Sequence, residues 1–171
     1  MKRAFVPALI ASAVMIAAAA PIAAQDFVAE RVKKSVDQAD LLAVVGALGH
    51  QVLEQGLAEN IYVVAENGDG VRYFLIGTAC NVNGVPGCQG IMMQARFDLP
   101  PTATLETLAK ANYDQAVLNS WADFEQKTLG FTRYQVLDEG VTMANIRENV
   151  KVLLAVVPEA YTIAAGESGA K

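Results

Sequence analysis

Alternation of apolar and polar residues predicts β-strands in the middle of the chain. Residues 71–78, VRYFLIGT, are rich in β-branched and aromatic side chains. In residues 91–97, IMMQARF, every second residue from Ile91 to Phe97 is apolar, so these side chains share one face of a strand. Upstream, NIYVVAENGDG predicts another strand and a turn, because Asn-Gly and Asp-Gly pairs favour tight turns. This turn lacks the spaced acidic series and terminal Glu of a calcium loop. We therefore expect three strands, with neighbours antiparallel.

Three other segments have helical spacing. The first, DLLAVVGALGHQVLEQG, starts at Asp40 as N-cap, and Gly49 leaves its end open; its apolar positions are Leu41, Val45, Leu48 and Val52. The second, TLETLAKANYD, follows the stop at Pro100-Pro101 and is expected to turn Leu105 and Leu108 inward.

The third helical segment starts at Thr142 and carries an apolar stripe wide enough to cover a sheet. The stripe consists of Met143, Ile146, Val150, Leu153, Leu154 and Val157. We expect Pro158 to end or kink this helix, and the following AAGESGAK to be frayed.

Residues 115–140 have two interpretations. Residues 115–127 can form one helix, in which Val117, Leu118 and Trp121 keep acceptable spacing. Alternatively, residues 116–122 and 128–137 form a second hairpin that turns at DFEQK. Periodicity alone does not decide between them.

The N-terminus has the pattern of a secretory signal peptide. Lys2 and Arg3 precede an uncharged apolar run from Ala4 to Ala20, and Ala24 follows as a small residue before the expected cut. A membrane anchor is the alternative, but this alanine-rich run of about 17 residues is at the short end of a bilayer span. We expect export to the periplasm or beyond, with no membrane span after cleavage. The predicted organisation is a signal peptide (1–24), an N-terminal lead-in (25–36), one domain (37–160) and a flexible C-terminal tail (161–171).

Charge narrows the possible partners. The net charge of the full chain is −5, and removing Lys2 and Arg3 with the signal makes it about −7. An acidic chain without a basic stripe argues against nucleic-acid binding, because phosphate contacts need clustered Lys and Arg.

The two cysteines lie in CNVNGVPGC, at positions 80 and 88. An even pair in an oxidising compartment predicts a disulfide between Cys80 and Cys88. A zinc site needs three or four ligands, and the chain has one histidine and two cysteines. A thioredoxin-like site needs two thiols with only two residues between them. If the flanking strands are antiparallel neighbours, opposed Cα atoms lie about 4.5–5.5 Å apart, which suits a disulfide.

Candidate chemistry is sparse in the sequence. His50 is the single histidine, and no local motif supplies a carboxylate partner or nucleophile for it. Asp138 and Glu139 are adjacent in a turn, where side chains point apart. We predict no catalytic, cofactor-binding or metal-binding residues. Trp121, Phe124 and Tyr134, with Phe131, could line a recognition groove or belong to the core, and one of Met92 and Met93 must face away from the core.

The order of these segments resembles that of the bacterial YbjN-domain proteins. The resemblance rests on YFLIGTAC…GCQGIMMQARFDLP and KTLGFTRYQVLDEGVTMANI, with Cys80, Cys88, Phe97 and the turn at Gly140 in matching places. It covers about residues 37–160 and implies an α+β domain in the order αβββαββα, one antiparallel sheet packed with helices, which is the type III secretion chaperone-like fold. It also favours the second hairpin over one helix at 115–127.

The resemblance implies binding rather than catalysis. Secretion chaperones of this fold hold extended protein segments and commonly dimerise, so we expect an unknown protein or peptide partner, a regulatory or chaperone-like role, or self-association as a homodimer. The competing hypothesis is a small-molecule binder or small periplasmic enzyme with a pocket between helices and sheet. No cofactor is expected.

Overall fold

A computed structural model describes residues 26–57 and 60–167. The expected signal peptide and the last four residues of the expected tail lie outside the described residues. The helices are α1 (Gln38–Ala47), α2 (Leu105–Asp114) and α3 (Met143–Ala164). The strands are β1 (Val32–Lys33), β2 (Gln51–Gln55), β3 (Tyr62–Glu66), β4 (Arg72–Cys80), β5 (Cys88–Asp98), β6 (Asn119–Asp123), β7 (Thr128–Val136) and β8 (Val141–Thr142).

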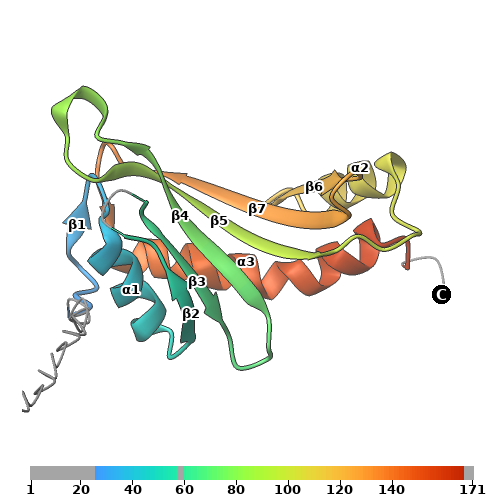
Figure 1. The fold of residues 1–171 in the computed structure, drawn as a ribbon, viewed down its shortest axis with the longest axis horizontal. Coiled ribbons are helices and arrows are strands. Elements are labelled where there is room, and N and C mark those ends of the chain that lie inside the picture. Colours follow the sequence, from blue (N-terminus) through green and yellow to red (C-terminus); the bar gives the residue numbers. More distant parts are fainter. Residues whose placement is uncertain (1–25, 58–59, 168–171) are drawn as a thin grey trace, which may run out of the picture.

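Six antiparallel strands form one sheet in the order β2-β3-β4-β5-β7-β6. Helices α1 and α3 pack against its strands and against each other, and α2 packs on α3 and β6. Figure 1 shows α3 passing behind the strands, so the face without helices is turned toward the viewer. The predicted α+β class is confirmed, and so is the second hairpin, which is β6 and β7.

The core lies between α3 and the central strands. Alternate residues of β4 and β5 point to the helices and are fully buried, among them Tyr73, Leu75, Ile91 and Met93. The predicted stripe of α3 is buried against them, except for Leu154, which is half-buried. Burial of each such side chain stabilises the fold by about 1.5–3 kcal/mol.

The start of α1 differs from the prediction. Asp37 is the N-cap, and Asp40 is the third helical residue of a capping box: the amide of Asp40 donates to Asp37 Oδ1 at 2.9 Å, and that of Asp37 donates to Asp40 Oδ2 at 3.2 Å. Asp40 is fully buried and also binds Arg31 at 3.1 Å and Lys33 at 2.6 Å. Both cations come from the lead-in, where β1 pairs with β8 in a second, two-stranded sheet.

The end of α1, left open at Gly49, lies before the position that the helical spacing up to Val52 indicates. The helix stops at Ala47, and Gly49, with φ +70°, turns the chain, while the amides of Gly49 and His50 donate to Gly46 and Val45. Residues 51–55, including Val52, then form edge strand β2, so the sheet has one strand more than the implied αβββαββα order. All five β2 side chains are exposed, which removes the alternation that identifies a strand.

One expectation about α2 is wrong, and one of the two alternatives for Pro158 in α3, that it ends the helix, is excluded. Leu105 is 75 % exposed at the first position of α2, whereas Leu108 is buried as predicted. Pro158 does not end α3, which continues to Ala164, because Val157, Ala160 and Ile163 are buried on both sides of it. Residues 161–164 therefore belong to this helix and not to a flexible tail. No helix within the described residues is long and apolar enough to cross a membrane.

Candidate binding surface

The predicted disulfide is present. Cys80 and Cys88 are bonded at the end of the β4–β5 ladder, with Cα atoms 3.8 Å apart, closer than the expected range. The enclosed loop projects from the sheet in Figure 1 and contains Asn81 and Asn83 in left-handed conformation. Cys88 also exchanges two backbone hydrogen bonds of 2.9 Å with Val36, so the loop anchors the lead-in. The disulfide therefore connects β4, β5 and the lead-in at this end of the sheet.

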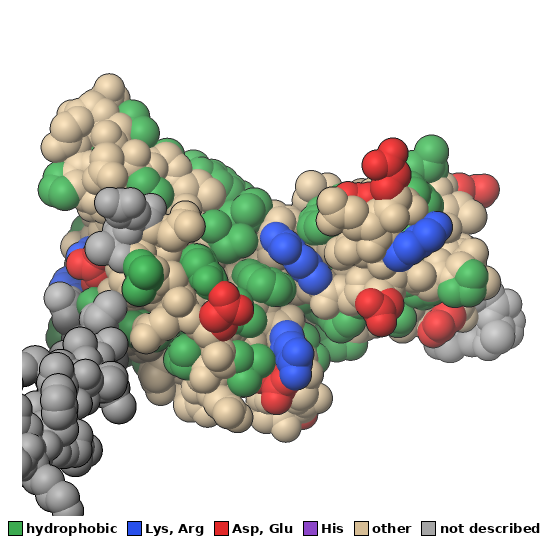
Figure 2. All heavy atoms as spheres, in the orientation of Figure 1, with side chains coloured by type: hydrophobic (Ala, Val, Ile, Leu, Met, Phe, Trp, Pro, Cys, Tyr) green, Lys and Arg blue, Asp and Glu red, His purple; other side chains and the backbone are tan. Residues whose placement is uncertain are grey.

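The face of the sheet opposite the helices carries two adjacent rows of side chains. One row runs across four strands as Tyr62, Ile76, Met92 and Tyr134, and the next contains Val64, Phe74, Gln94 and Thr132. Phe74, Ile76 and Met92 are half-buried, and Tyr134 is 53 % exposed. Figure 2, in the orientation of Figure 1, shows hydrophobic side chains over the middle strands with charged side chains beside them. We call this surface the open face.

Side-chain hydrogen bonds hold the polar part of the open face in place. Thr132 Oγ1 accepts from Trp121 Nε1 at 2.8 Å and from Gln94 Nε2 at 2.9 Å. Gln94 Oε1 in turn accepts from Arg96 Nε at 3.0 Å, and the Arg96 guanidinium lies 4.6 Å from the centre of the Phe74 ring. The bonds link β6 to β5 and fix the positions of Trp121 and Arg96.

Two aromatic side chains of the open face lie over glycines of neighbouring strands. A Cβ at Gly130 would overlap the Trp121 indole, and a Cβ at Gly90 would overlap the Tyr134 ring. Tyr134 also shares a hydrogen bond of 2.9 Å with Thr78. The absence of a Cβ at these two positions lets the aromatic rings approach the backbone of the neighbouring strands closely.

The predicted recognition residues do not all come together. Trp121 and Tyr134 are on the open face, whereas Phe124 lies in the β6–β7 turn and is 42 % exposed. Phe131 is fully buried on the helix side. Met92 is the methionine that faces outward, and Met93 is in the core. The role of Trp121, Phe124 and Tyr134 in recognition remains a prediction.

Phe74 and Ile76 were missed because β4 is apolar on both faces. The run Tyr73-Phe74-Leu75-Ile76 resembles a strand that is covered on both sides, and its sequence does not tell which side lacks a helix. The register with Met92 and Gln94 supplies that information.

His50 is paired with a buried phenol. Its Nδ1 lies 2.8 Å from Tyr73 Oη, and the rings meet edge to face. Burial lowers the pKa of His50 and raises the pKa of Tyr73. Within the described residues, neither side chain bonds to a carboxylate or to a nucleophile, and the pair stabilises the junction between α1 and the sheet.

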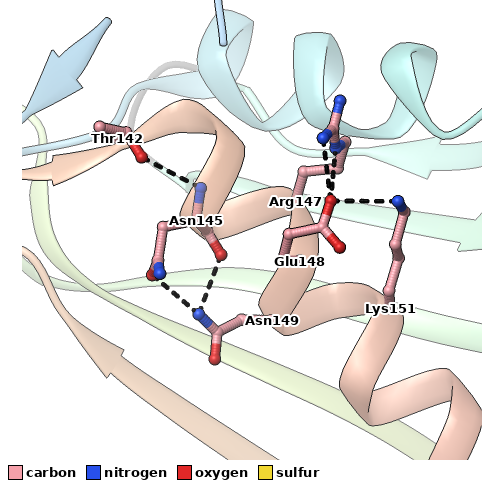
Figure 3. Close-up of polar contacts among 6 residues, drawn as sticks. All are labelled: Thr142, Asn145, Arg147, Glu148, Asn149 and Lys151. Carbon is pink, nitrogen blue, oxygen red and sulfur yellow. Dashed lines mark hydrogen bonds and ion pairs between the residues drawn. The ribbon is translucent and has the colours of Figure 1, made fainter. Parts of the chain in front are cut away.

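A denser cluster of polar side chains lies on α3, and two of its members, Asn145 and Asn149, also accept hydrogen bonds from β7. Figure 3 shows Glu148 between Arg147 and Lys151, at 2.9 Å and 3.0 Å, and Asn149 donating to Asn145. The two cations lower the pKa of Glu148. These are exposed contacts along one helix, which stabilise it slightly. Within residues 26–57 and 60–167, no group of three His, Cys, Asp or Glu side chains could hold a metal ion.

The two edges of the six-stranded sheet differ. At β6, the Asn112 side chain donates to the carbonyl of Ser120 at 3.0 Å and accepts from its amide at 2.7 Å, as a neighbouring strand would. At β2, the side chains are exposed, including those of Val52 and Leu53. The β6 edge is thus closed by a side chain, which natural sheets use against unwanted pairing.

Comparison with known proteins identifies the architecture. No family model and no curated protein sequence matches this chain. YbjN from E. coli superposes with a TM-score of 0.49 and 18% identity, over 71% of this chain and 89% of that one. The ExsC–ExsE complex gives a TM-score of 0.50 and 14% identity, over 73% of this chain and 91% of the other.

The chain has the type III secretion chaperone-like fold. At 14% identity the chaperone-like fold is established and the activity is not. The fold prediction made from the segment order is confirmed.

Proposed function

We propose that the chain is an exported, non-catalytic binding protein that holds a protein or peptide partner on the open face. The observation that carries this proposal is the row formed by Ile76, Met92 and Tyr134 beside Phe74, an apolar and aromatic surface with one methionine on the face of the sheet without helices. Methionine and aromatic side chains adapt to varied partners, and uncovered apolar surface of this kind is typical of interaction sites.

Two other observations support the proposal. The structurally similar ExsC–ExsE complex joins a protein of this fold to another protein. The Cys80–Cys88 disulfide suits an oxidising compartment, where the N-terminal signal pattern would place the mature chain.

The small-molecule hypothesis has weaker support. The interior between α3 and the sheet is filled by fully buried side chains. The apolar depression beside α3, lined by Val71, Phe97, Val157, Pro158 and Tyr161, measures about 260 Å³. Pockets for metabolite-sized ligands usually enclose about 300–1,000 Å³.

The test is capture of a partner from the envelope extract of the native host. Met92→Ser combined with Tyr134→Ala removes apolar surface from the open face and leaves the core untouched. We expect this variant to lose a protein, identified by mass spectrometry, that the wild type retains. Tyr113→Ala is the matched control, because Tyr113 is 87 % exposed on α2 and does not belong to the open face.

Equal capture by all three proteins would contradict the proposal. Size measurement over a range of concentrations distinguishes self-association from a second protein. A homodimer that dissociates in the Met92/Tyr134 variant would show that the open face binds another copy of the chain.

A further inference from the structure

The six-stranded sheet is split at one end. The β4–β5 ladder stops at Tyr73 and Ala95, whereas β5 continues with β7 to Asp98 and β4 continues with β3 to Arg72. Figure 1 shows β4 turning away from β5 toward the β3–β4 turn. Phe97 and Asp98 therefore have no β4 partner in the register. We call this opening the notch.

The notch has a different surface on each side of the sheet. On the helix side is the apolar depression of about 260 Å³, whose floor is α3 around Pro158. On the open face is a more open depression of about 470 Å³ with a mixed lining, which consists of Gly70, Arg72, Arg96, Phe97, Asp98 and Thr128. Phe97 lines both, so the two depressions meet at the end of β5.

We propose that the notch binds an extended protein segment in which a large apolar residue is directly adjacent to an acidic one. Side chains of an extended chain alternate between faces, so a segment lying beside Phe97 and Asp98 places one residue toward α3 and the next toward the open face. The apolar depression has room for one side chain, and the residue next to it faces the arginines. This inference rests on the proposed function, because it names the chemistry of the peptide.

Charge selects the acidic residue. Arg96 is exposed and is held against the Phe74 ring and Gln94, so its position is set before a ligand arrives. Arg72 has a 69% exposed side chain and pairs with Glu66 at 3.1 Å. The carboxylate of Asp98 lines the same depression and repels the carboxylate of an acidic ligand residue, which weakens the binding of that residue. A carboxylate beside two arginines gains charge-assisted hydrogen bonds, whereas an ammonium group is repelled by both arginines and has Asp98 alone as an acceptor of opposite charge in this depression.

The test is an NMR titration of the purified protein with three capped tetrapeptides, whose central pairs are Phe-Glu, Phe-Lys and Ser-Glu. We expect the Phe-Glu peptide to shift the amides of Val71, Phe97, Asp98 and Tyr161. We expect the other two peptides to bind at least about fivefold more weakly, since each lacks one of the two contacts.

Charge variants test the same site. Arg72→Gln and Arg96→Gln should each weaken Phe-Glu binding roughly two- to fivefold, and Asp98→Asn should strengthen it about twofold. Lys110→Gln is the control, because Lys110 lies on α2 and pairs there with Asp114. It should leave the affinity unchanged.

Several results would overturn the inference. Equal binding of the Phe-Glu and Phe-Lys peptides would show that the arginines do not recognise the peptide. Shifts confined to the amides of Ile76, Met92 and Tyr134 would place the peptide on the open face, which contradicts the notch inference but agrees with the proposed function. Decanoate, which has an apolar chain and a carboxylate but no peptide backbone, is titrated in the same way. If it binds more tightly than every peptide, the notch is a site for a free amphiphile and the inference is wrong. If the notch binds Phe-Glu but partner capture does not depend on Met92 and Tyr134, the notch inference stands and the open-face proposal fails.

Discussion

At the scale of single residues, Asp40 joins three parts of the structure. Its carboxylate completes the capping box of α1 and binds Arg31 and Lys33 of the lead-in, although it is fully buried. The sequence offers two aspartates, Asp37 and Asp40, and both suit an N-cap. Local spacing cannot choose between them, because the choice depends on two cations of the lead-in, Arg31 and Lys33.

Asp40→Asn should lower the free energy of unfolding by about 1–3 kcal/mol, because it leaves two cations without their buried counter-charge while they remain partly exposed. Urea denaturation measures the change. Asp114→Asn is the control, since the exposed Lys110–Asp114 pair should contribute less than about 1 kcal/mol. Equal effects of both substitutions would show that the Asp40 cluster has no special role.

His50 should make the stability depend on pH. Burial lowers the pKa of His50 in the folded protein below the ordinary value of 6.5, so the unfolded chain binds its proton more readily. The stability that comes from keeping His50 neutral is therefore present in full above pH 6.5, and it is lost as the pH falls from 6.5 through the lower pKa of the folded protein.

His50→Gln keeps a side chain able to bond with Tyr73 and removes the titration. We expect the wild type to lose more stability than this variant between pH 7.5 and pH 5.5, where carboxylates contribute equally to both proteins. Denaturation at the two pH values measures the difference. The same loss in both proteins would show that His50 does not contribute.

At the scale of elements, local sequence patterns identify those helices and strands that bury one face and expose the other. The stripe of α3 and the hairpin of β6 and β7 lie where periodicity or the family resemblance placed them. Strand β2 was read as helix because its exposed side chains have no alternation. Pro158 stays inside α3 because burial on both sides of it outweighs the lost hydrogen bond. The open face and the notch depend on strand register, and no single segment contains that information.

The disulfide stabilises the junction of β4, β5 and the lead-in. Cys80→Ala with Cys88→Ala should lower the free energy of unfolding by about 2–3 kcal/mol on the chain-entropy model. Denaturation of the oxidised wild type and the variant measures this, and the reduced wild type is the control for the small loss of side-chain volume. Unchanged stability in both the reduced protein and the variant would exclude the structural role.

At the scale of the whole molecule, the sheet presents different surfaces in different directions. Helices cover one face, Asn112 closes the β6 edge, and the open face and the notch are the surfaces that we propose for a partner. The α3 stripe needed for the core, and the turn glycines, could be predicted from the sequence. The partner surface could not, because aromatic and methionine residues serve cores and interfaces equally well.

Export determines which environment this surface meets. If Lys2, Arg3 and the apolar run to Ala20 form a signal peptide, the protein in the envelope begins at Gln25 and contains an oxidised cysteine pair. Intact-mass measurement of protein from the native host should therefore give residues 25–171 with two hydrogens fewer than the reduced chain. Both thiols should resist alkylation until they are reduced. Ala24→Asp should block cleavage and leave the longer chain, because the cut requires a small residue there. An uncleaved wild-type chain with freely alkylated Cys80 would place the protein in a reducing compartment and contradict export.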